Sequence, residues 1–200
     1  MRIYILRHED RTQDATFFSP LTSKGLENSI DLMKILKKYK INKIYSSPFI
    51  RTLQTISPYS KKYDVKVNLE YSLSEIQHPH IIPENSYKVT LPTYIAESFN
   101  YNPKYKTLFE PSEHKYPEEP KDVSKRVKKF LNHILNNKIQ KDDNILFVTH
   151  QAVCNEFLRI CTKGKSINIP SDFSYPRGGL TLIFDKDEWL FEKINWEYND

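Results

Sequence analysis

Four basic side chains in this sequence have the types needed to bind and transfer a phosphoryl group. Arg7 and His8 follow the apolar residues 3–6, Arg51 follows the tripeptide Ser-Ser-Pro, and His150 closes the run "NILFVTH". Guanidinium groups match phosphate oxygens bidentately, and a neutral imidazole is a nucleophile toward phosphorus. Neighbouring arginines disfavour a second positive charge, so each imidazole should stay neutral. If these residues meet, they predict a dianion site with a histidine nucleophile that needs no metal.

Alternating strands and helices are expected to bring these residues together. The alternation indicates an α/β fold, with a doubly wound, mostly parallel sheet and helices on both faces. The carboxyl ends of its strands would gather the site at one edge, with the two imidazoles within about 8 Å of each other. We expect strands at 2–6, 43–47, 65–69 and 144–150, closing antiparallel strands at 179–184 and 189–194, and helices within 19–39, from 47, at 121–137 and at 151–162.

Apolar spacing and capping residues define the expected helices more closely. Thr22 can cap the first helix, and the second should have Ser47 as its N-cap with Pro48 at the first helical position. The apolar face of the first helix is expected to be Leu26, Ile30, Met33 and Leu36, and that of the helix at 121–137 to be Val123, Val127, Phe130, Ile134 and Leu135.

Residues 1–200 are expected to form a single domain that carries an insertion at about 77–119. The insertion is rich in Pro, Tyr and His and has no sustained period, so it should lie outside the core, with a short helix near 91–99. We expect it to act as a lid that covers the pocket and selects the leaving group.

The composition narrows the partners without choosing one. A formal charge of +5 fits phosphorylated small molecules, phosphopeptides, nucleic acid or a membrane surface. Cys154 and Cys161 lie in apolar runs typical of a reduced, cytoplasmic protein, and no apolar run has the roughly 18 residues of a membrane span. We therefore expect a soluble cytoplasmic protein without a membrane partner, and the sequence makes no prediction of oligomeric state.

Other polar residues favour less specific interpretations. His78 and His80 have no third ligand nearby in the sequence, so we expect no metal site and no cofactor. His114 and His133 are expected at the surface. A Cys-x5-Arg loop and a P-loop are both absent from the sequence.

Five motifs in order resemble those of the histidine phosphatase superfamily, also called phosphoglycerate-mutase-like. They read "LRHED", "SPLTSKG", "YSSPFIRTLQT", "SLSEI" and "VTHQAV" and span residues 3 to 154. The resemblance implies that His8 is the nucleophile, that Arg7 and Arg51 hold the phosphoryl group, and that His150 stabilises it during transfer.

The same resemblance implies two further roles. Glu75, in "SLSEI", matches the proton donor to the leaving oxygen, and partial burial would help it to hold that proton. The backbone N–H of Gln151, at the start of a helix, is expected to contact phosphate. Substrate binding is thus expected at Arg7, Arg51 and Gln151, and catalysis at His8, Glu75 and His150.

Three departures from the family pattern indicate a divergent phosphatase rather than a glycolytic mutase. Glu9 replaces a usual glycine, Asp14 lies where mutases often have asparagine, and Gln151-Ala152 replaces a glycine pair. Glu9 would crowd the phosphate pocket or add negative charge beside it. Two alternatives stay open: a mutase primed by a phosphorylated cofactor, and a non-catalytic descendant that binds phosphorylated proteins or nucleic acid.

Overall fold

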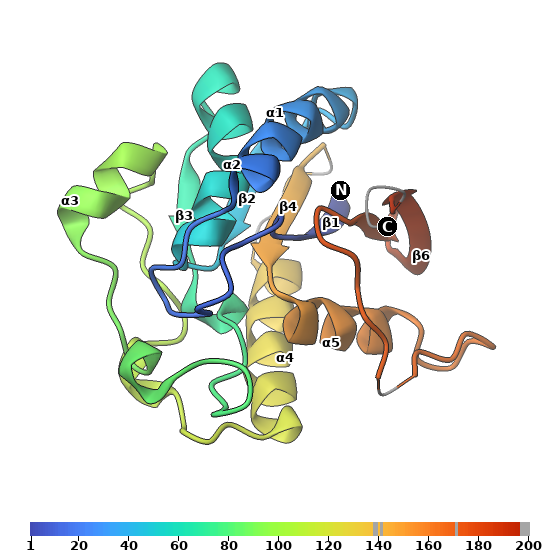
Figure 1. The fold of residues 1–200 in the computed structure, drawn as a ribbon. Coiled ribbons are helices and arrows are strands. Elements are labelled where there is room, and N and C mark those ends of the chain that lie inside the picture. Colours follow the sequence, from blue (N-terminus) through green and yellow to red (C-terminus); the bar gives the residue numbers. More distant parts are fainter. Residues whose placement is uncertain (138–139, 141, 171, 197–200) are drawn as a thin grey trace.

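The computed structural model describes residues 1–137, 140, 142–170 and 172–196. These residues include a six-stranded sheet of order β3-β2-β4-β1-β5-β6 (Figure 1). The neighbours among β1 to β4 pair in parallel, while β5 and β6 are antiparallel. The predicted α/β class and mostly parallel sheet are confirmed. The strands are β1 Arg2–Arg7, β2 Lys43–Ser46, β3 Val67–Leu69, β4 Asn144–Thr149, β5 Leu180–Asp185 and β6 Glu188–Asn195.

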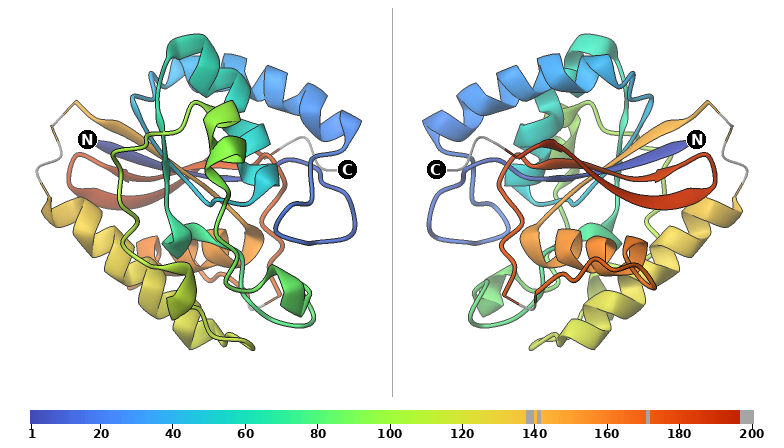
Figure 2. Two further views of the ribbon diagram at one scale, coloured as in Figure 1. Left: turned by 90° about the vertical axis from the view of Figure 1, so that its left-hand side faces the viewer. Right: turned by 90° about the vertical axis from the view of Figure 1, so that its right-hand side faces the viewer.

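Helices cover both faces of the sheet, as predicted. In Figure 2, α1 and α2 lie on one side of the sheet, and α4 and α5 lie on the other. No helix in the described part of the chain is long and apolar enough to cross a membrane. The helices are α1 Ser23–Lys38, α2 Ile50–Tyr63, α3 Thr93–Ala96, α4 Pro120–Asn136 and α5 Gln151–Cys161, and the 3₁₀ turns are η1 Tyr71–Leu73, η2 Glu84–Ser86, η3 Glu97–Phe99 and η4 Pro111–Glu113.

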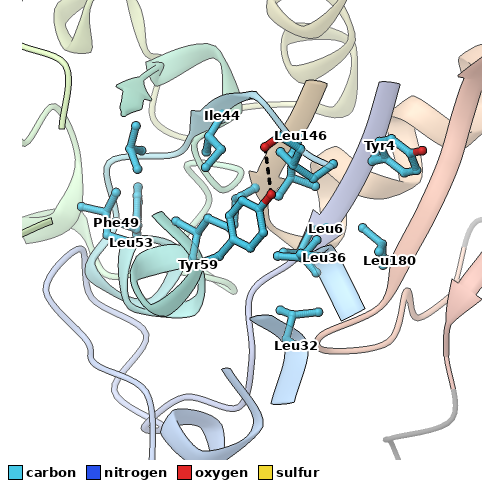
Figure 3. Packing of buried hydrophobic residues seen from close by; sticks show 14 of the residues in the cluster. Tyr4, Leu6, Leu32, Leu36, Ile44, Phe49, Leu53, Tyr59, Leu146 and Leu180 are labelled. Carbon is cyan, nitrogen blue, oxygen red and sulfur yellow. Dashed lines mark hydrogen bonds between the residues drawn. The ribbon is translucent and has the colours of Figure 1, made fainter. Parts of the chain in front are cut away.

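The core has two parts because side chains of β1 alternate between the faces of the sheet. Tyr4 and Leu6 pack under α1 and α2, and Figure 3 shows Leu6 beside Leu36. Ile3 and Ile5 pack on the other face, against α4 and α5. Each buried aliphatic side chain contributes roughly 1.5–3 kcal/mol. The central strands that carry Arg7 and His150 at their ends are therefore held on both faces.

Helix α1 buries only part of the predicted face, since Leu36 is buried and Met33 packs against the core but the other two residues do not. Leu26 and Ile30 are 43% and 52% exposed, whereas Gly25 and Ser29 are buried with Leu32 and Leu36. The reason is close packing, since a Cβ atom at Gly25 would lie 2.1 Å from the carbonyl oxygen of Asp10. The helix turns its small residues toward the loop after β1. Thr22 is the N-cap as predicted, accepting a 3.1 Å hydrogen bond from the Gly25 N–H.

The start of α2 also differs from the prediction. The helix begins at Ile50 with Phe49 at its N-cap, so Ser47 and Pro48 precede it. The reason is that the Ser47 hydroxyl is bonded to His150, at 2.8 Å from Nε2. Strand β3 begins two residues later than expected, at Val67.

The 77–119 segment contributes to the core, although the sequence placed it outside. Ile82, Leu91 and Ala96 are buried in the cluster under α1 and α2. The short helix expected near 91–99 is present as α3 followed by η3. His114 is buried at 5% exposure, so its predicted surface position is wrong, because its ring packs edge-on against Phe109 at 4.8 Å.

Candidate active site

Parallel pairing of β1 with β4 brings the two predicted histidines together. Arg7 is in register with Thr149, and the N–H of His8 donates to the Thr149 carbonyl at 3.0 Å. The rings of His8 and His150 lie 5.2 Å apart between centroids and are 2% and 0% exposed as residues. This distance is within the limit set from the sequence. The two imidazoles thus lie side by side at the carboxyl edge of the sheet.

The hydrogen bonding of His8 determines its tautomer. Its Nδ1 lies 2.7 Å from the carbonyl oxygen of Glu9. A carbonyl oxygen only accepts, so Nδ1 carries the proton and the lone pair is on Nε2. Burial, and then the charges of Arg51 and Arg7, lower the pKa of His8 well below its usual value. At neutral pH the ring is therefore an uncharged nucleophile.

His150 is held by Ser47, a residue the sequence analysis did not assign to the site. The Ser47 hydroxyl lies 2.8 Å from Nε2 of His150. Among the described residues Nδ1 has no hydrogen-bond partner, and it lies 3.9 Å from the Glu75 carboxylate. Burial, followed by the charge of Arg51, lowers the pKa of His150 well below its usual value. The Ser-Ser-Pro motif was the signal that could have identified Ser47.

Arg51 is buried at 1% exposure on the first turn of α2. Its Nη1 donates to the Thr16 carbonyl at 2.8 Å, and its guanidinium carbon lies 4.6 Å from the centre of the Phe49 ring. Its Nε finds no acceptor in the described part of the chain. Burial lowers the pKa of Arg51 to about 9, although the Glu75 carboxylate raises it. The side chain is therefore charged at neutral pH and only partly hydrogen-bonded.

Arg7 and Arg11 add positive charge to the same edge of the sheet. Arg7 is half-buried and donates to the Tyr175 carbonyl, while its Nε has no partner among the described residues. Burial lowers the pKa of Arg7. Arg11 is close enough for its charge to lower the pKa of both His8 and Arg51. The sequence analysis missed Arg11, whose spacing of three residues from His8 was the available signal.

Glu75 and Gln151 also lie at this edge. Glu75 is 7% exposed, and its Oε1 accepts from the N–H of Ile76 at 3.0 Å. Gln151 begins α5, so its N–H is among those without a partner inside the helix. Its side chain accepts a 3.3 Å hydrogen bond from Ser174. All six residues predicted for the site are thus gathered near the ends of β1, β2, β4 and η1.

The side chain of Glu9 contacts α1 and the loop before β5. Its carboxylate accepts from Asn28 at 3.2 Å, and a Cβ atom at Gly178 would lie 2.0 Å from Oε1. Burial raises the pKa of Glu9. Asp14 is exposed and accepts from the Thr12 hydroxyl at 2.6 Å. The Glu9 side chain thus fits because residue 178 is a glycine and has no side chain.

The histidine pair in the 77–119 segment forms a local contact. The rings of His78 and His80 lie 5.0 Å apart. Across the described ranges, no group of three His, Cys, Asp or Glu side chains is arranged to hold a metal ion.

A family model described as the histidine phosphatase superfamily (branch 1) matches residues 3–197. The match confirms the family that the five motifs predicted, and with it the expected enzyme class. No curated protein matches the sequence.

Solved structures of similar fold cover almost the whole chain at low identity. The ecdysone phosphate phosphatase from Bombix mori, in complex with tungstate, is 15% identical and has a TM-score of 0.69. The match covers 97% of this chain and 92% of the chain of that phosphatase. A putative alpha-ribazole-5'-P phosphatase from Escherichia coli is 18% identical, with 98% and 96% covered and a TM-score of 0.67. A mycobacterial glucosyl-3-phosphoglycerate phosphatase with inorganic phosphate is 14% identical, with 99% and 97% covered and a TM-score of 0.66. At these identities the likeness shows the fold.

Proposed function

The chain belongs to the histidine phosphatase superfamily, and from this we propose that it hydrolyses a phosphomonoester through a phosphohistidine at His8. The observation that carries the proposal is the tautomer of His8, whose Nδ1–H donates a hydrogen bond to the Glu9 carbonyl at 2.7 Å. The Nε2 lone pair is then available beside His150, Arg7 and Arg51. Phosphoryl transfer needs an uncharged nucleophile and positive groups that stabilise the charge of the transferring phosphoryl group.

In the first step, Nε2 of His8 attacks phosphorus in line with the ester oxygen. The N–P bond forms while the P–O bond to the leaving group breaks. Glu75 gives its proton to the departing oxygen, and its carboxyl is left ionised. His8 keeps its Nδ1 proton, which stays bonded to the Glu9 carbonyl.

In the second step, water attacks the phosphorus of phosphohistidine. The P–N bond breaks and its electron pair returns to Nε2. The ionised Glu75 takes a proton from the attacking water, which restores the starting state and releases inorganic phosphate.

The phosphoryl oxygens are bound by groups whose hydrogen-bonding capacity is incompletely used within the chain. Arg7 and Arg51 each have a buried Nε without a protein partner in the described residues, and Nδ1 of His150 is in the same condition. The N–H of Gln151 supplies a donor at the start of α5, and the charge of Arg11 acts on the site from nearby. Positive charge from these groups stabilises the transferring phosphoryl group without a metal.

The substrate is a phosphorylated small molecule or a phosphopeptide, whose leaving group is covered by the 77–119 segment. This segment begins two residues after Glu75, and its Ser86 hydroxyl accepts from the N–H of Phe17 at 2.7 Å. Phe17 follows Thr16, whose carbonyl binds Arg51. The segment therefore contacts the loop that borders the phosphoryl site. Burial raises the pKa of both free cysteine thiols, which fits a reduced, cytoplasmic location.

The test is turnover of p-nitrophenyl phosphate in the presence of a chelator, combined with trapping of the intermediate. The native protein should acquire an acid-labile, base-stable phosphate label, and His8→Ala should acquire none. Turnover by His8→Ala should fall by at least about 10³-fold. Loss of native turnover on adding chelator would reject the metal-free mechanism.

The two alternatives from the sequence are outcomes of the same experiment. A mutase would depend on a bisphosphate to prime His8. A non-catalytic binding protein would bind oligonucleotides in a salt-sensitive manner, or phosphorylated proteins, and would give no turnover.

A further inference from the structure

A buried ion pair lies behind the segment that carries Glu75. Arg126 of α4 and Glu118 are 2% and 1% exposed, and they are joined by two hydrogen bonds, Nε to Oε1 at 2.8 Å and Nη2 to Oε2 at 3.1 Å. We propose that this pair positions Glu75 for proton donation, with Arg126 as the positioning residue and Glu118 as its anchor. The proposal rests on the proposed function, because it assigns a cause for the placement of the general acid.

Besides pairing with Glu118, Arg126 also contacts two backbone carbonyls in the turn that ends at Glu75. Its Nη1 donates to the carbonyl of Ser72 at 2.5 Å, and its Nη2 lies 3.4 Å from the carbonyl of Glu75 itself. A single planar guanidinium therefore fixes the separation of two carbonyls three residues apart. Lysine has a point charge in place of this fork and cannot reproduce the arrangement.

Glu118 holds the far end of the same segment. Its Oε2 accepts from the N–H of Gln77 at 2.9 Å, and its own N–H donates to the Gln77 carbonyl at 2.6 Å. The Gln77 side chain donates in turn to the Glu75 carbonyl at 2.7 Å. The carbonyl of Glu75 is thereby approached from two directions, by Arg126 and by Gln77.

The carboxyl group of Glu75 depends on this backbone placement. Among the described residues it accepts from the backbone N–H of the adjacent Ile76 at 3.0 Å and lies 3.9 Å from Nδ1 of His150. The separation from His150 is too long for a hydrogen bond that would direct the carboxyl group toward a leaving oxygen. A displacement of about 1 Å at such a group lowers the rate by about 10²-fold, so the support behind it matters.

Stability alone does not explain a buried ion pair at this place. Apolar side chains of similar volume usually give equal or greater stability than a buried ion pair. Here the two side chains also satisfy the Ser72 carbonyl and the Gln77 N–H, and Arg126 adds a second donor to the Glu75 carbonyl. An apolar replacement would leave the Ser72 carbonyl and the Gln77 N–H unpaired and free to shift, which makes orientation of Glu75 the function that the pair performs.

The experiment compares two substrates that differ in their need for a proton donor. Departure of p-nitrophenolate needs little protonation, whereas departure of phenolate from phenyl phosphate needs a general acid. Arg126→Lys keeps a buried charge beside Glu118, and Glu118→Leu/Arg126→Met removes both charges, so both variants avoid an unpaired buried carboxylate. Each should lose about 10- to 100-fold more turnover with phenyl phosphate than with p-nitrophenyl phosphate, as Glu75→Gln should.

A matched control is Arg159→Met on α5, whose arginine is partly exposed and makes a 3.8 Å ion pair with Glu156. Its ratio of the two turnover rates should equal that of the native protein. A second readout is chemical rescue. Glu118 and Arg126 both line a cavity of about 250 Å³ that Lys115, Lys125 and Lys129 border. Methylguanidinium should therefore restore phenyl phosphate turnover to Arg126→Ala.

The possible outcomes separate this inference from the proposed function. Equal loss of turnover with the two substrates in the Arg126 variants, beside a selective loss in Glu75→Gln, would overturn the positioning role and leave the proposed function standing. Absence of both turnover and phosphate label in the native protein would overturn the proposed function and this inference with it.

Discussion

Two regions of the molecule bury the same three residue types with opposite results. In the first, Arg51, His150 and Glu75 lie at the carboxyl edge of the sheet. In the second, Arg126 of α4 lies beside Glu118 and His114 of the 109–118 segment. Among the described residues, Arg126 makes four hydrogen bonds to protein acceptors, whereas Arg51 makes one, to the Thr16 carbonyl.

The difference indicates where the chain has kept binding capacity. The Glu75 carboxylate is 3.9 Å from Nδ1 of His150, and within the described part of the chain no tighter ion pair is made by His8, His150, Arg7 or Arg51. Buried cations that are incompletely paired are unfavourable until an anion binds. In the second region, Arg126 and Glu118 hold the backbone, and the four hydrogen bonds of Arg126 use most of its N–H groups. His114 of that region has no hydrogen-bond partner among the described residues, so the contrast is one between the two arginines. An arginine buried with partners builds structure, and one buried without them prepares a dianion site.

Replacing each buried arginine by methionine should change stability in opposite directions. Arg126→Met leaves Glu118 buried and unpaired, so we expect the free energy of unfolding to fall by about 3–5 kcal/mol. Arg51→Met removes a buried charge that has few partners, so the free energy of unfolding should stay the same or rise. Urea unfolding monitored by circular dichroism measures both. Destabilisation of similar size by the two substitutions would contradict the comparison.

Inorganic phosphate should stabilise the protein through the first region. At a concentration 100 times the dissociation constant, it should add about 2.7 kcal/mol to the free energy of unfolding. Arg51→Met should lose most of this gain, while Glu118→Leu/Arg126→Met should keep it. Melting temperature as a function of phosphate concentration gives the measurement, with chloride at equal ionic strength as the control. Equal phosphate stabilisation of all three proteins would remove the distinction between the regions.

Acidification should destabilise both regions through their histidines. Burial and the charge of Arg126 lower the pKa of His114 to about 2, while an unfolded histidine titrates near 6.5. Below about pH 6.5 the unfolded chain therefore binds a proton that the folded chain does not. Stability should fall as pH decreases, by up to about 1.4 kcal/mol per pH unit for each such histidine.

Substitution of His114 separates its share from those of His8 and His150, whose pKa values are lowered in the same direction. In His114→Leu, the slope of unfolding free energy against pH between 6 and 5 should decrease by about one proton. Denaturant titrations at a series of pH values provide the slope. An unchanged slope would mean that His114 takes up its proton in the folded state.

Arg11 should give the smallest effect, because it is half-exposed and its charge is screened. Arg11→Gln should raise KM for p-nitrophenyl phosphate by about fivefold at low salt, and the difference should shrink in 0.5 M salt. Lys24→Gln, an exposed change on α1, is the control. A salt-independent loss larger than about 100-fold would place Arg11 among the groups that bind the phosphoryl group directly.

The sequence predicted those parts of the molecule that depend on local pattern. The strand ends that carry Arg7, His8 and His150 are readable because apolar runs stop there, and parallel topology then requires them to meet. The start of helix α1 was predicted correctly from Thr22, but only Met33 and Leu36 of its predicted apolar face pack into the core. Hydrophobicity alone assigns that face, whereas close contact with the backbone of Asp10 decided it.

Contacts made between distant segments were not readable. Glu118 lies in a turn-rich segment, and Arg126 lies in the helix that follows it. The role of the pair depends on its contact with residues 72–77, which only the folded chain brings against it. In the sequence His114 resembles an ordinary loop histidine, and its burial depends on a tertiary contact with Phe109. Such cases depend on tertiary packing, which has no period in the sequence.

The contact between Glu9 and Gly178 has a consequence for any attempt to change this chain. Gly178 adopts a left-handed φ of +63° and has no room for a methyl group while Glu9 keeps its full length. Gly178→Ala and Glu9→Gly should therefore be non-additive, because Glu9→Gly removes the clashing carboxylate and leaves only the strain of a left-handed alanine. A substitution path toward Gly178→Ala should pass through Glu9→Gly first, so a redesign has to treat the two positions together.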